Sequence, residues 1–196
     1  MKEPDILAAL KPVVKAFTEV GVAYQIGGSV ASSAYGSARA TLDVDLVARL
    51  RDEQVRPLAG LLKDAYYVDE EMIRDAIATR SSFNLIHLES MHKVDVFVLK
   101  ERPYDLQAFE RARTDTLAED DPTPFRLASP EDVILNKLEW YRKGDHVSDR
   151  QWTDVLGVIK VQGYALDLAY LRSWANELGV SDLLEEALTQ AGLRAR

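Results

Sequence analysis

The stretch GGSVASSAYGSARATLDVDL, residues 27–46, decides the fold class of this chain. A short β-prone run, 22–26, precedes it, and the small residues at 30–35 predict a helix directly after the glycines. Residues 36–41 are typical of a loop, and the alternation of apolar and polar residues over 42–48 predicts a strand. The expected order is therefore strand, Gly-Gly turn, helix, loop and strand.

Two carboxylates, Asp43 and Asp45, lie two residues apart on the last of these strands. Because side chains alternate between the faces of a strand, both carboxylates point the same way. Two like charges at this spacing repel unless a cation lies between them. Mg²⁺ or Mn²⁺, which prefer hard oxygen ligands, would meet that need. A solvated strand face is the alternative interpretation of the same pattern.

A third acid, Asp95, lies in the β-prone run KVDVFV, residues 93–98. A lone aspartate among apolar strand residues is costly unless it is paired, hydrogen-bonded or metal-bound. If this strand lies beside that of Asp43, three carboxylates converge, which is enough to hold two metal ions for a phosphoryl-type displacement. Asp95 could instead form an ion pair with Lys93 or Arg39.

The turn Gly27-Gly28-Ser29 is a candidate phosphate site. Glycines let backbone N–H groups approach a ligand closely, and the N-terminus of the following helix favours an anion. The Ser29 hydroxyl can bond a phosphate oxygen. On its own, however, Gly-Gly-Ser is more often an ordinary turn.

Composition limits the possible classes of protein. The 196 residues contain 24 Lys and Arg against 32 Asp and Glu, a formal charge of −8, and no cysteine. Disulfides, a thiolate nucleophile and zinc sites with sulfur ligands are therefore excluded, and coating of nucleic acid through bulk positive charge is disfavoured. The N-terminus lacks a signal-peptide pattern and no apolar run suggests a membrane span, so we expect a cytoplasmic protein without a membrane partner.

The remaining patterns predict an α/β (α+β) part, residues 1–127, with a mixed sheet flanked by helices, and a smaller all-α part, residues 128–196. The first part should also contain helices over 5–20, 52–65, 70–78 and 104–112, strands over 82–88 and 93–99, a further strand, and a turn at 119–122. The second should contain helices over 130–143, 148–162, 167–178 and 181–191.

The joint pattern resembles a known superfamily, the DNA polymerase β-type nucleotidyltransferases. The residues that match are Gly27-Gly28-Ser29, Gly36, Arg39, Thr41, Asp43, Asp45 and Leu46, with Asp95 in the place of the third carboxylate. The chain is most similar to the AbiEii/AbiGii toxin-type members and their small bacterial relatives. That narrower similarity rests on Ser129-Pro130-Glu131-Asp132, Lys137-Leu138, Asp149-Arg150 and Asp154-Val155, and the resemblance covers about residues 20–160.

The resemblance implies a fold and a reaction. Residues 1–127 would be the nucleotidyltransferase catalytic domain, and residues 128–196 a helical domain that closes the nucleotide cleft. The enzyme would transfer a nucleoside monophosphate from an NTP, such as ATP, to an acceptor hydroxyl and release pyrophosphate. Asp43, Asp45 and Asp95 would be the catalytic residues and would ligate two Mg²⁺ ions, with Mn²⁺ as a substitute.

Further residues acquire roles through the same resemblance. The nucleotide would be held by Gly27, Gly28, Ser29, Arg39 and Lys137. Lys137 would reach the triphosphate, whereas Arg39 could equally be a structural partner of Asp43 or Asp45. Asp154 matches a polar position of the toxin-type group, but an ion pair is the simpler interpretation, and Asp149 is expected to cap its helix.

The acceptor stays open at the level of sequence. The toxin-type resemblance favours tRNA or protein, with a possible cognate antitoxin as partner, while a small molecule such as an aminoglycoside-like alcohol is the alternative. A tRNA acceptor would require basic residues to cluster at the cleft, for which the candidates are Arg39, Arg49, Arg51, Arg80 and Lys137. A non-catalytic nucleotide- or partner-binding module of a two-gene system is a further alternative, against which the presence of all three acids argues.

Overall fold

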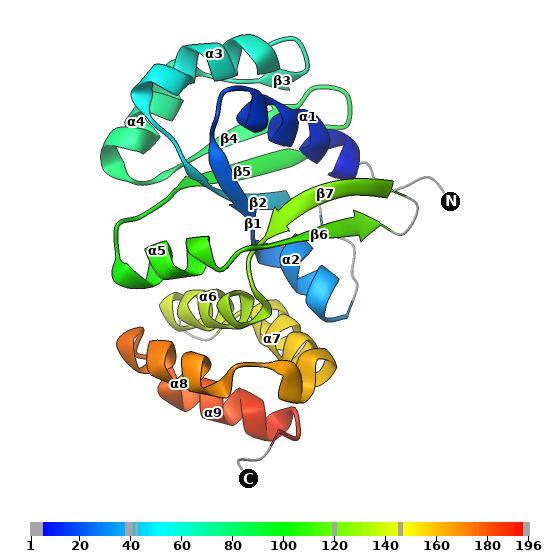
Figure 1. Ribbon diagram of the computed structural model, residues 1–196, viewed down its shortest axis with the longest axis vertical. Helices are drawn as coiled ribbons and strands as arrows, with labels where there is room; N and C mark the ends of the chain where they lie inside the picture. Colours follow the sequence, from blue (N-terminus) through cyan, green and yellow to red (C-terminus); the bar gives the residue numbers. More distant parts are fainter. Residues whose placement is uncertain (1–5, 38–40, 42, 119–120, 145–146, 194–196) are drawn as a thin grey trace. The chain divides into compact units, whose positions relative to one another are not determined.

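The computed structural model describes residues 6–37, 41, 43–118, 121–144 and 147–193 (Figure 1). The chain forms two compact units, one of residues 1–27 and 40–127 and one of residues 28–39 and 128–196. The helix after the Gly-Gly turn, α2 (Gly28–Tyr35), therefore belongs with the C-terminal helices. The division predicted from the sequence, at residue 127, places α2 in the first part. It therefore differs from the division into compact units at this helix.

A seven-stranded mixed sheet forms the centre of the first unit, in the order β3-β4-β5-β2-β1-β7-β6. β2 pairs with β5 and β1 with β7 in parallel, and the other neighbours are antiparallel. The strands are β1 (Ala23–Ile26), β2 (Asp43–Arg49), β3 (Tyr66–Tyr67), β4 (Ser82–His87), β5 (Lys93–Val98), β6 (Arg113–Ala118) and β7 (Asp121–Leu127). The predicted mixed sheet with flanking helices is confirmed.

One face of the sheet is apolar because β2 and β5 alternate strictly. Val44, Leu46, Val94 and Val96 are fully buried on this face. Helices α1 and α4 contact these strands, and α3 packs between them, as Figure 1 shows at the top of the first unit. The first-unit helices are α1 (Ile6–Glu19), α3 (Asp52–Leu62), α4 (Glu70–Thr79) and α5 (Pro103–Glu110). Covering this face leaves the opposite one for polar side chains.

The second unit is helical. Besides α2 it contains α6 (Pro130–Lys143), α7 (Asp149–Gln162), a 3₁₀ turn (Gly163–Ala165), α8 (Leu168–Glu177) and α9 (Ser181–Gln190). Ser129 caps α6 as its sequence predicts, accepting a hydrogen bond from Asp132 N at 3.2 Å. Gly36 lets α2 approach α7, since a Cβ there would lie 2.9 Å from Val158 N. The predicted all-α composition of this part is confirmed.

Three local predictions differ from the structure. One strand and a turn at 119–122 were predicted, but a second strand, β7, begins at residue 121, inside that turn, while residues 119–120 lie outside the described ones. The two-residue strand β3 was not predicted at all. The helix α7 is capped by Ser148, whose hydroxyl accepts from Gln151 N, so the assignment of Asp149 as the cap is wrong. Within the described ranges, no helix is both long and apolar enough to span a bilayer.

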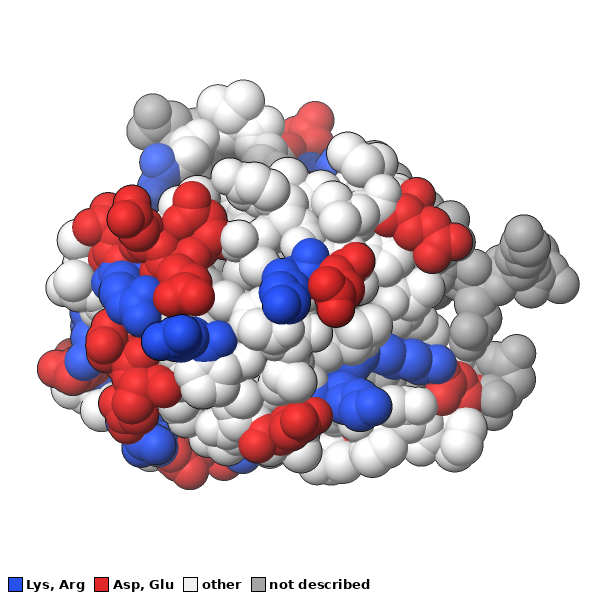
Figure 2. Space-filling view, turned by 90° about the horizontal axis from the view of Figure 1, so that it is seen from above, with Lys and Arg blue, Asp and Glu red and all other residues white. Residues whose placement is uncertain are grey.

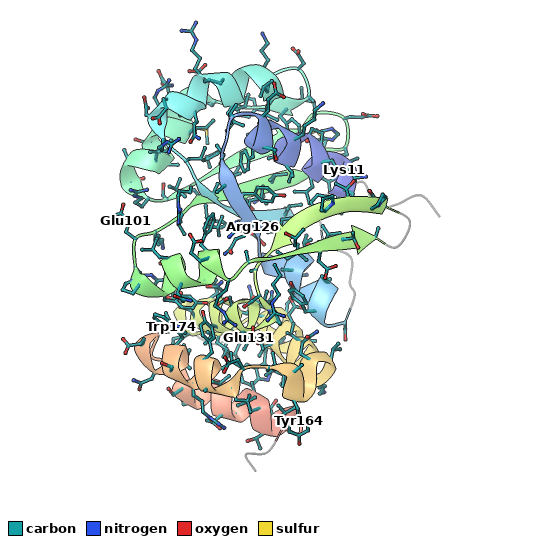
Figure 3. The ribbon with its side chains drawn as sticks, in the orientation of Figure 1. Lys11, Glu101, Arg126, Glu131, Tyr164 and Trp174 are labelled. Carbon is teal, nitrogen blue, oxygen red and sulfur yellow. The ribbon has the colours of Figure 1, made fainter. Side chains whose placement is uncertain are left out.

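An ion pair ties the N-terminal helix to the sheet. Lys11 on α1 pairs with Asp121 at the start of β7, and Lys11 lies beside that strand in Figure 3. The same Asp121 carboxylate accepts hydrogen bonds from Thr123 N at 3.0 Å and from Thr123 Oγ1 at 2.6 Å. These contacts join α1 to the start of β7, a strand that contains prolines.

Candidate active site

Three carboxylates lie together on the polar face of the sheet. In the parallel pair β2–β5, Asp45 is the register partner of Asp95, and Asp43 is two residues before Asp45 on the same face. Neighbouring strands lie about 4.8 Å apart, so the three side chains start from adjacent positions. We refer to Asp43, Asp45 and Asp95 as the carboxylate cluster. Asp43 is exposed, whereas Asp45 and Asp95 are half-buried.

A lysine lies within this arrangement. Lys93 is the register partner of Asp43 and lies two residues before Asp95, so it shares their face. Its Nζ is 2.8 Å from Asp95 Oδ2. The hydrogen bond to Asp95 raises the pKa of the Lys93 ammonium, and the charges of Asp95, Asp43 and Asp45 raise it further. In this conformation Asp95 is thus ion-paired with Lys93, the first of the two partners considered from the sequence.

Two amides flank the carboxylate cluster, and both were missed in the sequence. Asn84 on β4 is the register partner of Asp95, and Gln25 on β1 is that of Val47, so both share the polar face. Gln25 is only 3% exposed, and its Oε1 accepts no hydrogen bond from any described residue. The sequence does mark Gln25, because a glutamine in an otherwise apolar β-prone run is uncommon unless its amide has a partner.

The donor set of the carboxylate cluster fits a divalent metal. It offers oxygen ligands alone, which suit Mg²⁺ or Mn²⁺, and strand pairing brings them to adjacent positions. As the described side chains stand, however, no group of three acids or histidines is arranged to hold an ion. The positions therefore match the chemistry of such a site, while the Asp95 carboxylate is paired with Lys93.

The first residue of the Gly-Gly turn, Gly27, lies next to β2. Gly27 N donates to Asp45 O at 2.9 Å, so this amide belongs to the sheet and is not offered to a ligand. Gly28 has a φ of +52°, which favours glycine, and starts α2. Ser29 follows in the first turn of that helix, as predicted. Any phosphate contact by the backbone would therefore come from the amides after Gly27.

Lys137 is buried within the second unit. It projects from α6 and is 5% exposed, and its Nζ donates to Asp154 Oδ2 at 2.8 Å and to Gln151 Oε1 at 3.1 Å. The expectation that Asp154 takes part in an ion pair is confirmed. Gln151, the second partner of the lysine, had no signal in the sequence.

The other basic residues considered for a tRNA acceptor do not form a free basic surface. Arg49 lies 3.0 Å from Glu110, Arg51 2.7 Å from Glu53 and Arg80 2.5 Å from Glu101. On the face shown in Figure 2, acidic and basic side chains are interspersed. Arg39, the remaining candidate, lies outside the described residues.

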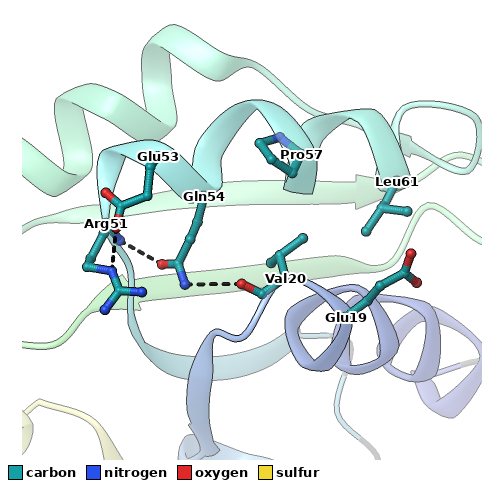
Figure 4. A pocket seen from close by; sticks show the side chains of 7 residues that line it. All are labelled: Glu19, Val20, Arg51, Glu53, Gln54, Pro57 and Leu61. Atoms are coloured by element: carbon teal, nitrogen blue, oxygen red, sulfur yellow. Dashed lines mark hydrogen bonds and ion pairs between the residues drawn. The ribbon is translucent and has the colours of Figure 1, made fainter.

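A surface hollow of about 520 Å³ lies at the junction of α1 and α3 (Figure 4). Its central side chain, Gln54, donates to Val20 O at 3.2 Å and accepts from Arg51 N at 3.0 Å. Arg51 lines it, but none of the predicted catalytic, metal-binding or nucleotide-binding residues does. Because Gln54 uses its amide to hold α3 against the turn that follows α1, the hollow is explained by the packing of these two segments.

Comparison with known proteins supports the fold. The chain matches no protein-family model and no curated protein. The antibiotic-resistance factor ANT(2″)-Ia in solution is similar, with a TM-score of 0.57 and 12% identity over 90% of this chain and 95% of that one. ANT(2″)-Ia in complex with adenylyl-2″-tobramycin has a TM-score of 0.61 and 13% identity over 89% and 98%.

A third similar structure is an antigenic nucleotidyltransferase-like protein from Paracoccidioides brasiliensis. Its TM-score is 0.53 and its identity 20%, over 92% of this chain and 91% of that one. The chain therefore has the polymerase β-type nucleotidyltransferase fold, as residues 27–46 predict. The narrower similarity to the AbiEii/AbiGii type stays a prediction.

Proposed function

We propose that this protein is a metal-dependent nucleotidyltransferase, which moves a nucleoside monophosphate from an NTP to an acceptor hydroxyl and releases pyrophosphate. The observation that carries the proposal is the pairing of Asp45 with Asp95 across β2 and β5, with Asp43 on the same face. In a chain with a nucleotidyltransferase fold, this is the donor set that the reaction needs.

Each residue of the carboxylate cluster has a role in the proposal. Asp43 and Asp45 hold two Mg²⁺ ions, or Mn²⁺, from one strand, and Asp95 contributes from the next. When bound, such ions neutralise the charge that develops on the transferred phosphoryl group. Asp95 accepts the proton of the acceptor hydroxyl. The acceptor oxygen then forms a bond to the α-phosphorus, and the bond to the pyrophosphate oxygen breaks.

The nucleotide contacts come from both parts of the chain. Gly28 and Ser29 bind the β- and γ-phosphates through α2, with Gly27 holding the turn against β2. Arg39 supplies positive charge to the triphosphate, and Lys137 adds its own charge only if nucleotide binding opens its pair with Asp154. In this proposal residues 1–127 form the catalytic domain of a cytoplasmic enzyme, and residues 128–196 close the nucleotide cleft.

Two acceptor classes have support of different kinds. The motifs at 129–132 and 149–155 favour the AbiEii/AbiGii toxin type, which implies a tRNA or protein acceptor and a possible cognate antitoxin. The ion pairs of Arg49, Arg51 and Arg80 weaken the case for tRNA, because a phosphate backbone would compete with a carboxylate at each one. A small-molecule acceptor is the second candidate, favoured by the adenylyl-tobramycin complex of a protein with the same fold.

A transfer assay tests the proposal. The full chain is incubated with Mg²⁺ and each α-labelled NTP, beginning with ATP, against total tRNA, a protein extract and a panel of aminoglycosides. We expect label on one acceptor class together with stoichiometric pyrophosphate. The variant Asp43→Asn/Asp45→Asn should abolish both products.

A binding measurement covers the non-catalytic alternative. A non-hydrolysable NTP with Mn²⁺ should raise the melting temperature of the wild-type protein by mass action, and the double variant should lose that gain. If the nucleotide binds but pyrophosphate never forms, the chain is a nucleotide-binding module. If the gain persists in the double variant, the carboxylate cluster is not the metal site.

A further inference from the structure

We propose that Lys93 is a built-in counter-ion of the carboxylate cluster, and that a divalent metal binds there only by displacing its ammonium from Asp95. The inference rests on the proposed metal-dependent function and concerns the regulation of that same site. It assigns to Lys93 a part that opposes metal binding rather than assisting it.

The geometry places one positive charge among three negative ones. Lys93 lies beside Asp43 across the strand pair and two residues from Asp95 along β5, all on one face. Its Nζ is bonded to Asp95 Oδ2 at 2.8 Å, so it uses a carboxylate oxygen that a metal would need. No described group of three acids is arranged to hold an ion, which is expected while Asp95 is directed toward the lysine.

The two members of this pair differ in their freedom to move. The Lys93 side chain is 40% exposed, whereas that of Asp95 is 15% exposed. The lysine can therefore turn into water without repacking, and the aspartate stays in position on its strand. An ion pair at this degree of exposure is weak, so a doubly charged ion at millimolar concentration can replace it.

Electrostatics sets the size of the expected effect. A unit charge and a divalent ion about 6 Å apart repel each other enough, even at the dielectric constant of water, to weaken metal binding about tenfold. Replacing Lys93 with a neutral residue of similar length removes both this repulsion and the competition for Asp95. The variant Lys93→Met should therefore bind Mn²⁺ at least about tenfold more tightly than the wild type.

The melting temperature should reverse its order between two conditions. In EDTA, Lys93→Met takes the ion-pair partner from Asp95 and a positive charge from beside the other two carboxylates, so it should melt below the wild type. In saturating Mn²⁺ the variant should gain more than the wild type, because tighter binding stabilises more by mass action. A lysine with a merely structural role would lower the melting temperature equally in both conditions.

The experiment measures Mn²⁺ binding by calorimetry and unfolding by circular dichroism, for the full chain. Lys93→Arg keeps the charge and should bind Mn²⁺ like the wild type. Lys63→Met is the matched control, since it removes an exposed lysine at the end of α3 and changes the net charge equally. Lys93→Gln replaces Lys93→Met if the latter fails to fold.

The outcomes separate this inference from the proposed function. If Lys93→Met and the wild type bind Mn²⁺ equally, and Asp43→Asn/Asp45→Asn abolishes binding, Lys93 is not the counter-ion while the metal site stands. If neither the wild type nor Lys93→Met binds Mn²⁺, both proposals fail. Tighter binding by Lys93→Met but not by Lys63→Met supports the inference.

Discussion

Two lysine–aspartate pairs of this molecule have the same length and different surroundings. Lys93–Asp95 on the sheet and Lys137–Asp154 between α6 and α7 both have a nitrogen–oxygen distance of 2.8 Å. The side chains of the first pair are 40% and 15% exposed, and both side chains of the second are 6% exposed. The difference shows that an ion-pair distance alone does not indicate whether the pair can open.

The exposure of each ion pair to water determines how easily the pair opens. At Lys93 the ammonium can be hydrated as it leaves, so little is lost when another cation takes its place. At Lys137 both charges are removed from water, and Gln151 accepts a further hydrogen bond from the ammonium. Opening that pair would separate two buried opposite charges, which is costly. Lys93 is thus an exchangeable cation, and Lys137 a fixed one.

The largest expected effect comes from removing a charge next to the exchangeable pair. Asp45→Asn should lower the rate of nucleotide transfer at least about a thousandfold, or about 4 kcal/mol of transition-state stabilisation, because it removes a metal ligand. The variant should still fold in EDTA, because asparagine has nearly the shape of aspartate and residue 45 is only half-buried. Steady-state pyrophosphate release and circular dichroism measure the two quantities.

Asp64→Asn is the control for this variant, because Asp64 is an exposed acid in the loop after α3. It should leave the rate of transfer unchanged. Near wild-type transfer by a folded Asp45→Asn protein would contradict the proposed role of the carboxylate cluster.

The fixed pair should dominate stability. Lys137→Met leaves Asp154 buried without its cation, and we expect a loss of about 3–5 kcal/mol in the free energy of unfolding. By contrast, Lys93→Met in EDTA should lose no more than about 1 kcal/mol. Urea unfolding of the two variants measures the difference directly.

A double variant separates the charge from the packing. Lys137→Met/Asp154→Leu removes both ions and should recover most of the lost stability, because both buried charges are gone. If the double variant is as unstable as Lys137→Met, the loss comes from packing rather than from the pair. If stability returns while transfer stays low, the result supports the predicted role of Lys137 at the triphosphate.

The sequence predicts the exchangeable pair better than the fixed one. Alternation within 42–48 and 93–98 places each aspartate on a face, and one assumption, that the strands are neighbours, brings them together. The burial of Lys137 depends instead on α7 packing against α6, which no local pattern reports. The same limit explains the β6–β7 hairpin. Pro122 and Pro124 disfavour a strand locally, but β7 can contain them because it pairs with β1 only at Leu127, beyond both prolines.

Backbone hydrogen bonds show the same limit at the Gly-Gly turn. The glycines correctly indicate the break between β1 and α2, because Gly28 adopts a positive φ. That Gly27 N donates to Asp45 O depends on which strand lies beside β1. The residue types are therefore sufficient to locate the turn, but the availability of its amides is set by tertiary pairing.

A third pair, Lys11–Asp121, sharpens the comparison and should give the smallest effect. The Lys11 hydrogen bond, and then those from Thr123, lower the pKa of Asp121 to about 2. An aspartate with a lowered pKa stabilises the folded protein above its unfolded pKa of about 3.9, and that stability is lost as the pH falls toward 2. Lys11→Met should therefore melt below the wild type at pH 6 and approach it at pH 2. Lys15→Met, an exposed lysine on the same helix, should show no such convergence. A melting-temperature difference between Lys11→Met and the wild type that is constant from pH 6 to pH 2 would mean that Lys11 acts through packing of its chain and not through its charge.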